Sequence, residues 1–232
     1  RQASLALASL PLMPTLASAH GALPVQPAAH RRLTIVLSGG MSSQETFDPK
    51  TGAAIDRRSP ADAIPTSVPG VHFSAWLPRL AARAHEFTLI RAVTLGTAPA
   101  THAAGLSLLP TATVRSRSAS LRSATSLPYG ASRFGRLCHA AVERLALGSA
   151  AECVHFAETV FDTLSWDLHA NGAGLPIALS DYRDTLCPQL DQVLCALFDD
   201  LQARGLWSQT DIHIVTEVGR SAMFNSRGGR EH

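Results

Sequence analysis

Short runs of apolar, β-branched residues recur along the chain, and they limit its fold class more than any other feature. Residues 33–37 (LTIVL) form such a run and lead into Ser-Gly-Gly, which predicts a buried strand followed by a glycine turn. Further strands are predicted over residues 87–93, 153–157 and 212–216. Each run has the length of a strand and is too short for an ordinary helix.

Segments with helical periodicity separate these runs. Residues 75–85 follow Ser74, a residue type that caps helices, and carry apolar side chains on one face. Further helices are predicted over residues 131–147 and 188–204, each followed by a glycine. Strands that alternate with helices predict an α/β fold with a mostly parallel sheet. In such sheets ligands bind where loops leave the carboxyl ends of the strands.

Composition excludes several classes of protein. The chain has 232 residues, enough for one large domain or two small ones with a buried core. It is 46% hydrophobic and 16% charged, which excludes a disordered charged tail. Its formal net charge of +2 argues against a nucleic-acid partner. Past the N-terminal region it has no run of 18 apolar residues, so a multi-span membrane protein is excluded and no integral membrane association is expected.

The N-terminal residues 1–20 have the pattern of an export signal that is truncated at its start. Arg1 precedes an apolar stretch over residues 5–16 and then small residues at 17–19. A lone arginine here suits the tail of a twin-arginine signal, and the alternative is a short buried helix interrupted by prolines. Export predicts a periplasmic or secreted protein whose folded domain spans residues 21–232.

The four cysteines are compatible with an oxidising compartment and allow three disulfide pairings. None lies in a C-x-x-C pair, which argues against a zinc ribbon. Cys138 and Cys195 fall on the apolar faces of predicted helices, where buried free thiols are expected.

Three loops that follow predicted strands carry polar groups. The second contains Asp167 and His169, whose spacing places a carboxylate and an imidazole on one side of an extended segment. Such mixed oxygen and nitrogen donors suit Zn²⁺, Mn²⁺ or iron. Alone the spacing is a weak signal, and the residues by themselves favour structural roles. Asp167 suits a turn cap, and His169 suits a surface imidazole. Glu217 suits the N-terminus of a following turn, where Arg220 can pair with it. The loops span residues 39–48, 166–171 and 217–232.

At these loops the sequence resembles a known family. The strings LSGGMSSQETFDPKTG, WDLHANG, LDQVLCALFDDLQARGLWSQTDIHIVTEVGR and GGREH are similar to those of the DUF1501 family, exported bacterial proteins placed beside the sulfatases in the alkaline-phosphatase-like superfamily. The resemblance implies a three-layer α/β/α domain with a mostly parallel sheet. It also implies a metal-dependent hydrolase of phosphate or sulfate esters that acts on an anionic small molecule or a sulfated or phosphorylated glycan.

The resemblance also assigns residues to a metal site. Asp167 and His169 match the family's W-D-x-H motif, Glu217 matches the acidic residue of E-F-G-R, and His232 matches the histidine of G-R-D-H. These four are the predicted ligands of a divalent ion, which is Zn, Mn, Ca or Mg. His102 lies in a region where relatives also carry histidines and is a secondary candidate.

Two catalytic roles follow from the resemblance. Arg220 is the candidate to clamp an anionic group of the substrate, since a guanidinium binds such groups bidentately. Ser42 stands where an attacking or anion-holding hydroxyl is expected, although no base lies beside it in the sequence.

The chain also departs from the family pattern. A short Ser/Arg-rich linker around residues 111–127 stands where relatives have a long middle section, and the C-terminal part of the family is lacking after His232. Val218 replaces the usual phenylalanine, and Met41 replaces the usual proline. An incomplete sheet exposes strand edges and apolar surface. The alternatives to an enzyme are therefore a non-catalytic exported binding or scaffold protein and an inactive truncated fragment.

Overall fold

The computed structural model of this chain describes residues 30–91, 101–114, 127–170 and 174–232. The predicted export signal and most of the predicted linker lie outside these residues.

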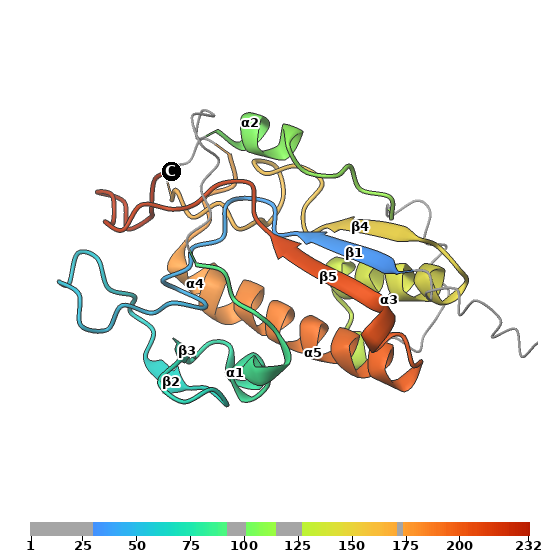
Figure 1. Cartoon of the computed structure of the whole chain (residues 1–232). Coiled ribbons are helices and arrows are strands. Elements are labelled where there is room, and N and C mark those ends of the chain that lie inside the picture. Colours follow the sequence, from blue (N-terminus) through green and yellow to red (C-terminus); the bar gives the residue numbers. More distant parts are fainter. Residues whose placement is uncertain (1–29, 92–100, 115–126, 171–173) are drawn as a thin grey trace, which may run out of the picture.

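Three parallel strands form the central sheet (Figure 1), in the order β4-β1-β5. The middle strand β1 (Arg31–Val36) is flanked by β4 (Ala151–His155) and β5 (Thr210–Val215). Three of the four predicted strands are thereby confirmed. Because Val36 pairs with both His155 and Val215, the three carboxyl ends meet at one edge of the sheet.

The fourth predicted strand, over residues 87–93, is wrong for the residues described there. Residues 87–91 form no strand. The ring of Phe87 instead packs in an aromatic cluster with Phe47, Phe73 and Phe198, with centroids 6.2–6.5 Å from Phe87. The packing of this partly buried ring against the core outweighs the strand-like composition of the segment, which is only a local preference.

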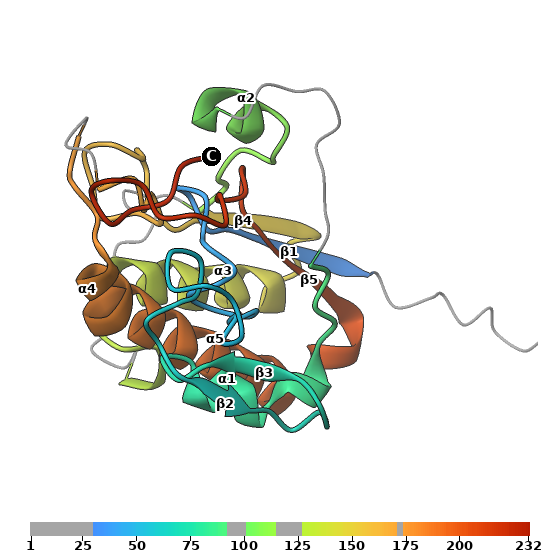
Figure 2. The ribbon, with the colours of Figure 1, turned by 90° about the vertical axis from the view of Figure 1, so that its left-hand side faces the viewer.

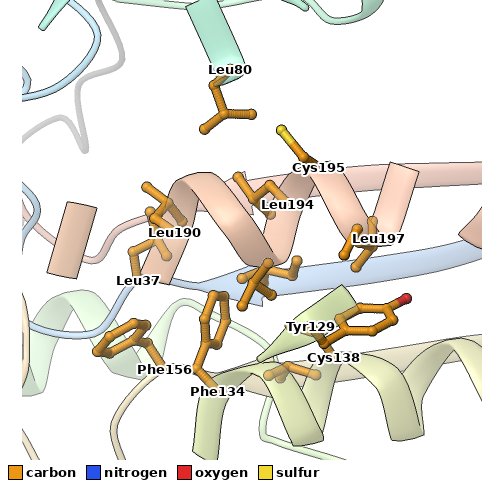
Figure 3. Packing of buried hydrophobic residues seen from close by; sticks show 14 of the residues in the cluster. Leu37, Leu80, Tyr129, Phe134, Cys138, Phe156, Leu190, Leu194, Cys195 and Leu197 are labelled. Atoms are coloured by element: carbon orange, nitrogen blue, oxygen red, sulfur yellow. The ribbon is translucent and has the colours of Figure 1, made fainter. Parts of the chain in front are cut away.

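The two long helices lie side by side on one face of the sheet (Figures 1 and 2). They are α3 (Arg133–Ala146) and α5 (Cys187–Ala203), within two residues of their predicted bounds. The hydroxyl of Ser132 accepts the Gly135 N–H at 3.0 Å and caps α3. Figure 3 shows the apolar faces of both helices meeting in the core, which also covers the buried side of β1.

The opposite side of the sheet carries only one short helix among the described residues, α2 (His102–Ser107) (Figures 1 and 2). The fold is therefore a mixed α/β structure with a mostly parallel sheet, which confirms the predicted α/β fold class. A turn-like segment precedes α5 and consists of α4 (Leu179–Asp181) and a π-helical turn (Tyr182–Leu186).

A small unit packs on α5 and consists of the antiparallel strands β2 (Ala63–Pro65) and β3 (His72–Ser74) with the helix α1 (Pro78–Ala82). The helix predicted over residues 75–85 is thus shorter than expected and is not capped by Ser74, which belongs to β3. Asp191 of α5 performs the capping, since its carboxylate accepts the backbone N–H groups at the first turn of α1. Three-residue 3₁₀ helices complete the list: Ala84–Glu86, Leu127–Tyr129 and Trp207–Gln209.

All four cysteines are buried free thiols, as predicted for Cys138 and Cys195. In the described parts of the chain, no helix has the length and apolar character needed to cross a membrane.

Candidate metal centre

The loops that leave the carboxyl ends of the three strands come together over the sheet edge. The Gly39 turn after β1 approaches the segment that follows β4 so closely that a Cβ atom at Gly39 would lie 2.5 Å from the backbone nitrogens of Trp166 and Asp167. The φ angle of Gly39 is +113°, which also favours glycine. The chain near its C-terminal end joins them through the Arg230 N–H, which donates to the Leu168 carbonyl at 2.6 Å.

Four side chains converge at this edge. His102, Asp167, His169 and His232 each offer one ligand atom, and these atoms all lie within 4.8 Å of one another. The Nε2 atoms of His102 and His232 are 3.2 Å apart, and Nε2 of His102 is 3.6 Å from Oδ1 of Asp167. Nδ1 of His169 contacts the same Asp167 oxygen.

This donor set fits a divalent transition metal. Ligand bonds of about 2.1 Å in a tetrahedral arrangement place the donor atoms about 3.4 Å apart, close to the separations at His102. Three imidazoles and one carboxylate are ligands that suit Zn²⁺, Mn²⁺ or iron better than Ca²⁺ or Mg²⁺, which prefer oxygen donors.

Three of the four predicted ligands belong to this group, and the fourth does not. Asp167, His169 and His232 are brought together from segments far apart in the sequence. Glu217 instead lies behind His102: its Oε1 is 2.8 Å from Nδ1 of His102 and accepts the Gly39 N–H at 2.6 Å. The secondary candidate His102 takes the place expected for Glu217.

The local fold explains how His102 reaches the group. The Thr101 hydroxyl accepts the Ala104 N–H at 3.2 Å and caps α2, whose first residue is His102. Gly105 of the same helix packs directly on the backbone of Glu217, where a Cβ atom would lie 2.2 Å from the carbonyl oxygen. The sequence signal for His102 was its place in a region where relatives also carry histidines, and no spacing links it to the W-D-x-H motif.

The charges at the edge affect one another. Burial disfavours the ionised form of Asp167, but hydrogen bonds from His102, Arg220 and His169 and the charge of Arg220 outweigh it and hold the Asp167 pKa well below its ordinary value. Burial also disfavours protonated His102, yet its hydrogen bonds to Asp167 and Glu217 raise its pKa to about 9. Likewise, burial is outweighed at Glu217, chiefly by the His102 contact, so its pKa is lowered.

Arg220 is fully engaged with the protein. Its side chain is 1% exposed, and Nη2 donates to Oδ1 of Asp167 at 2.6 Å. Nε donates to the Gly40 carbonyl at 2.8 Å, Nη1 donates to the Arg230 carbonyl at 3.0 Å, and Nη2 also contacts the Gly39 carbonyl. The guanidinium therefore connects the loops, and its role as a substrate clamp remains a prediction. It does not pair with Glu217, the alternative suggested by the sequence.

Ser42 lies in a separate buried group. Its side chain is buried, and its hydroxyl donates to the carboxylate of Glu45, three residues further along the chain. Glu45 is in turn paired with Arg230 at 2.7 and 2.9 Å. The Ser42 N–H donates to the Tyr182 hydroxyl at 3.2 Å. These contacts hold the loop after β1 in place, and the proposed nucleophilic role of Ser42 remains a prediction.

Comparison with known proteins identifies one family. The model of a family described as "Protein of unknown function (DUF1501)" matches residues 29–136 and residues 129–232. The two regions together span most of the chain. No curated protein and no solved structure gives a significant match.

Proposed function

We propose that this chain, which belongs to the DUF1501 family, binds a divalent metal ion and hydrolyses phosphate or sulfate esters. The observation that carries the proposal is the convergence of three imidazoles and one carboxylate at the carboxyl edge of a parallel sheet. The motif resemblance is the basis for proposing a sulfatase-like fold of the alkaline-phosphatase type, with an anionic small ester or a sulfated or phosphorylated glycan as substrate. The ligands are His102, Asp167, His169 and His232.

The chemistry divides between the ion and the protein. A bound divalent ion polarises an ester oxygen and lowers the pKa of water. The three histidines supply neutral nitrogen donors, and Asp167 supplies the one negative charge within the ligand group. Arg220 holds Asp167 by a hydrogen bond and an ion pair, so that carboxylate stays ionised and fixed in direction.

Metal analysis of the purified chain tests the proposal first. We expect about one Zn²⁺ or Mn²⁺ per chain by elemental analysis, and loss of that ion in Asp167→Ala and His102→Ala. His213→Ala is the matched control, because His213 is an exposed histidine of β5 on the same sheet. A metal-free wild type, or equal metal content in Asp167→Ala, would refute the site.

Turnover is tested separately with aryl phosphate and aryl sulfate esters. The metal-loaded chain should hydrolyse at least one of the two, and chelation should remove the activity. The same assay on Ser42→Ala and Arg220→Lys tests the two predicted catalytic roles. A stoichiometric ion without turnover of either ester would leave a binding protein and would refute the hydrolase.

A second candidate is a non-catalytic exported binding or scaffold protein. The observation that favours it is that the charges of the site balance without a metal ion. Arg220 pairs with the carboxylate of Asp167, and protonated His102 pairs with that of Glu217. It predicts a folded, metal-free chain without turnover. An inactive fragment predicts instead a broad thermal transition and binding of apolar dyes, to which exposed Ile55, Ile90 and Leu147 would contribute.

Export is the proposed route to a periplasmic or secreted location. It rests on the pattern of residues 1–20 in the sequence. Fractionation of bacteria that express the chain behind an initiator methionine and a second arginine, which complete the signal pattern, should place it outside the cytoplasm, cleaved near residue 20. A cytoplasmic chain of full mass would contradict the proposal.

A further inference from the structure

We propose that Glu217 is a positioning residue of the metal centre, which directs His102 toward the ion without binding the ion itself. The inference rests on the proposed metal function and assigns Glu217 a different role from the one expected from its motif. It follows from where the Glu217 carboxylate points and from what holds it there.

The Glu217 carboxylate has protein partners at both oxygens. Its side chain is fully buried. Oε1 accepts the Gly39 N–H at 2.6 Å. Oε2 lies 3.3 Å from the Thr216 hydroxyl, whose proton is shared with the Leu37 carbonyl at 3.1 Å. A buried carboxylate with these partners loses hydrogen bonds if it rotates toward the ligand group, and such losses are costly in a buried site.

The contact with His102 selects which ring nitrogen faces the ion. Because Oε1 of Glu217 already accepts the Gly39 N–H, it is an acceptor here too, and the hydrogen bond at 2.8 Å is donated by Nδ1 of His102. The lone pair of the metal-binding form is then on Nε2, and Nε2 is the atom that lies near His232 and Asp167, at 3.2 and 3.6 Å. A carboxylate that accepts from the second nitrogen of a ligand histidine sets its orientation and its basicity.

The backbone of Glu217 also positions the helix that carries His102. Gly105 of α2 contacts the Glu217 backbone at a distance that only glycine permits. The helix has six residues, so its own hydrogen bonds do little to fix it in place. Residue 217 therefore positions His102 twice, through the side chain at Nδ1 and through the backbone beneath α2.

Titration of the whole purified chain with Zn²⁺ and with Mn²⁺ by calorimetry tests the role. Glu217→Ala should weaken binding by about 10- to 100-fold, the usual effect of losing such a partner, while the stoichiometry stays at one ion per chain. Glu217→Gln keeps an acceptor oxygen of the same shape and should lose less. Glu143→Gln is the matched control, because Glu143 also faces a histidine, His139 at 3.7 Å, on the distant helix α3.

X-ray absorption of the Zn²⁺ complex separates a positioning residue from a ligand. We expect the same number of oxygen and nitrogen ligands in the wild type and in Glu217→Ala. Loss of one ligand in Glu217→Ala would show that Glu217 binds the ion, and unchanged affinity in Glu217→Ala would show that it has no role. If the wild type itself binds no ion, the proposed function fails together with this inference. If the wild type binds and both Glu217 variants match it, only the inference fails.

Discussion

The buried ion pair between Glu45 and Arg230 should stabilise both the fold and the metal centre, and Glu45→Ala tests this. Both side chains are 0% exposed, and Arg230 donates to Glu45 from Nε at 2.9 Å and from Nη2 at 2.7 Å. Its remaining partners are uncharged: the carbonyls of Arg57 and Ala222 and the face of the Phe224 ring at 3.8 Å. Without Glu45 a buried guanidinium therefore has no negative partner.

The expected loss is about 3–5 kcal/mol, because removal of one member of a buried pair leaves an uncompensated charge. With a urea m-value of about 2 kcal/mol/M, this corresponds to a fall in the unfolding midpoint of about 1.5–2.5 M. Urea unfolding followed by circular dichroism measures it. Because Arg230 lies two residues before His232, Zn²⁺ affinity should fall as well.

An exposed pair of the same geometry provides the control. Arg183 donates to Asp184 from Nε at 2.7 Å and from Nη2 at 2.9 Å, but both side chains are more than half exposed. Asp184→Ala should leave the midpoint unchanged, since water solvates the remaining charge. If Glu45→Ala leaves the unfolding midpoint as little changed as Asp184→Ala does, burial of the ion pair does not determine how much it stabilises the fold, and the prediction is refuted.

Three further changes test the supports of the fold. Asp191→Ala should lower the free energy of unfolding in urea by about 1–3 kcal/mol, because two N–H groups of α1 lose their acceptor. An unfolding midpoint equal to that of the wild type would show that Asp191 does not cap α1. Gly39→Ala should lower the free energy of unfolding by more than about 1 kcal/mol and weaken Zn²⁺ binding. Gly52→Ala, whose added methyl group meets open space, should change neither. Equal urea midpoints for the two variants would contradict the close approach of Gly39 to the backbone of Trp166 and Asp167. At Glu152, burial opposes ionisation, but hydrogen bonds, among them those from Thr113 and Arg144, hold the pKa below its ordinary 4.5. The ionised Glu152 therefore contributes to the free energy of unfolding above pH 4.5, and this contribution is lost as the pH falls. The stability of Glu152→Gln should therefore fall less steeply than that of the wild type in thermal scans from pH 6 to pH 3, and parallel curves would contradict this.

The local pattern of the sequence determined the framework. Strands β1, β4 and β5 were predictable to within two residues because a short run rich in apolar residues overlaps each of them. Helices α3 and α5 were predictable because their apolar side chains recur with helical period. The motif resemblance added Asp167, His169 and His232, which the fold brings together. These predictions rest on neighbours within a few residues or on matched strings.

Only the tertiary structure decided which polar groups meet and in what roles. His102 and Glu217 are 115 residues apart, and no periodicity or motif spacing shows that His102 joins the group with Asp167, His169 and His232 while Glu217 contacts His102 from behind. Arg220 contacts the Asp167 carboxylate, the ring nitrogens of His169 and the carbonyls of other loops, up to 181 residues away in sequence. The segment after residue 87 likewise follows an aromatic cluster instead of its strand preference. Such outcomes depend on buried contacts between distant segments, whose energies exceed local preferences and have no signature in the residues next to them.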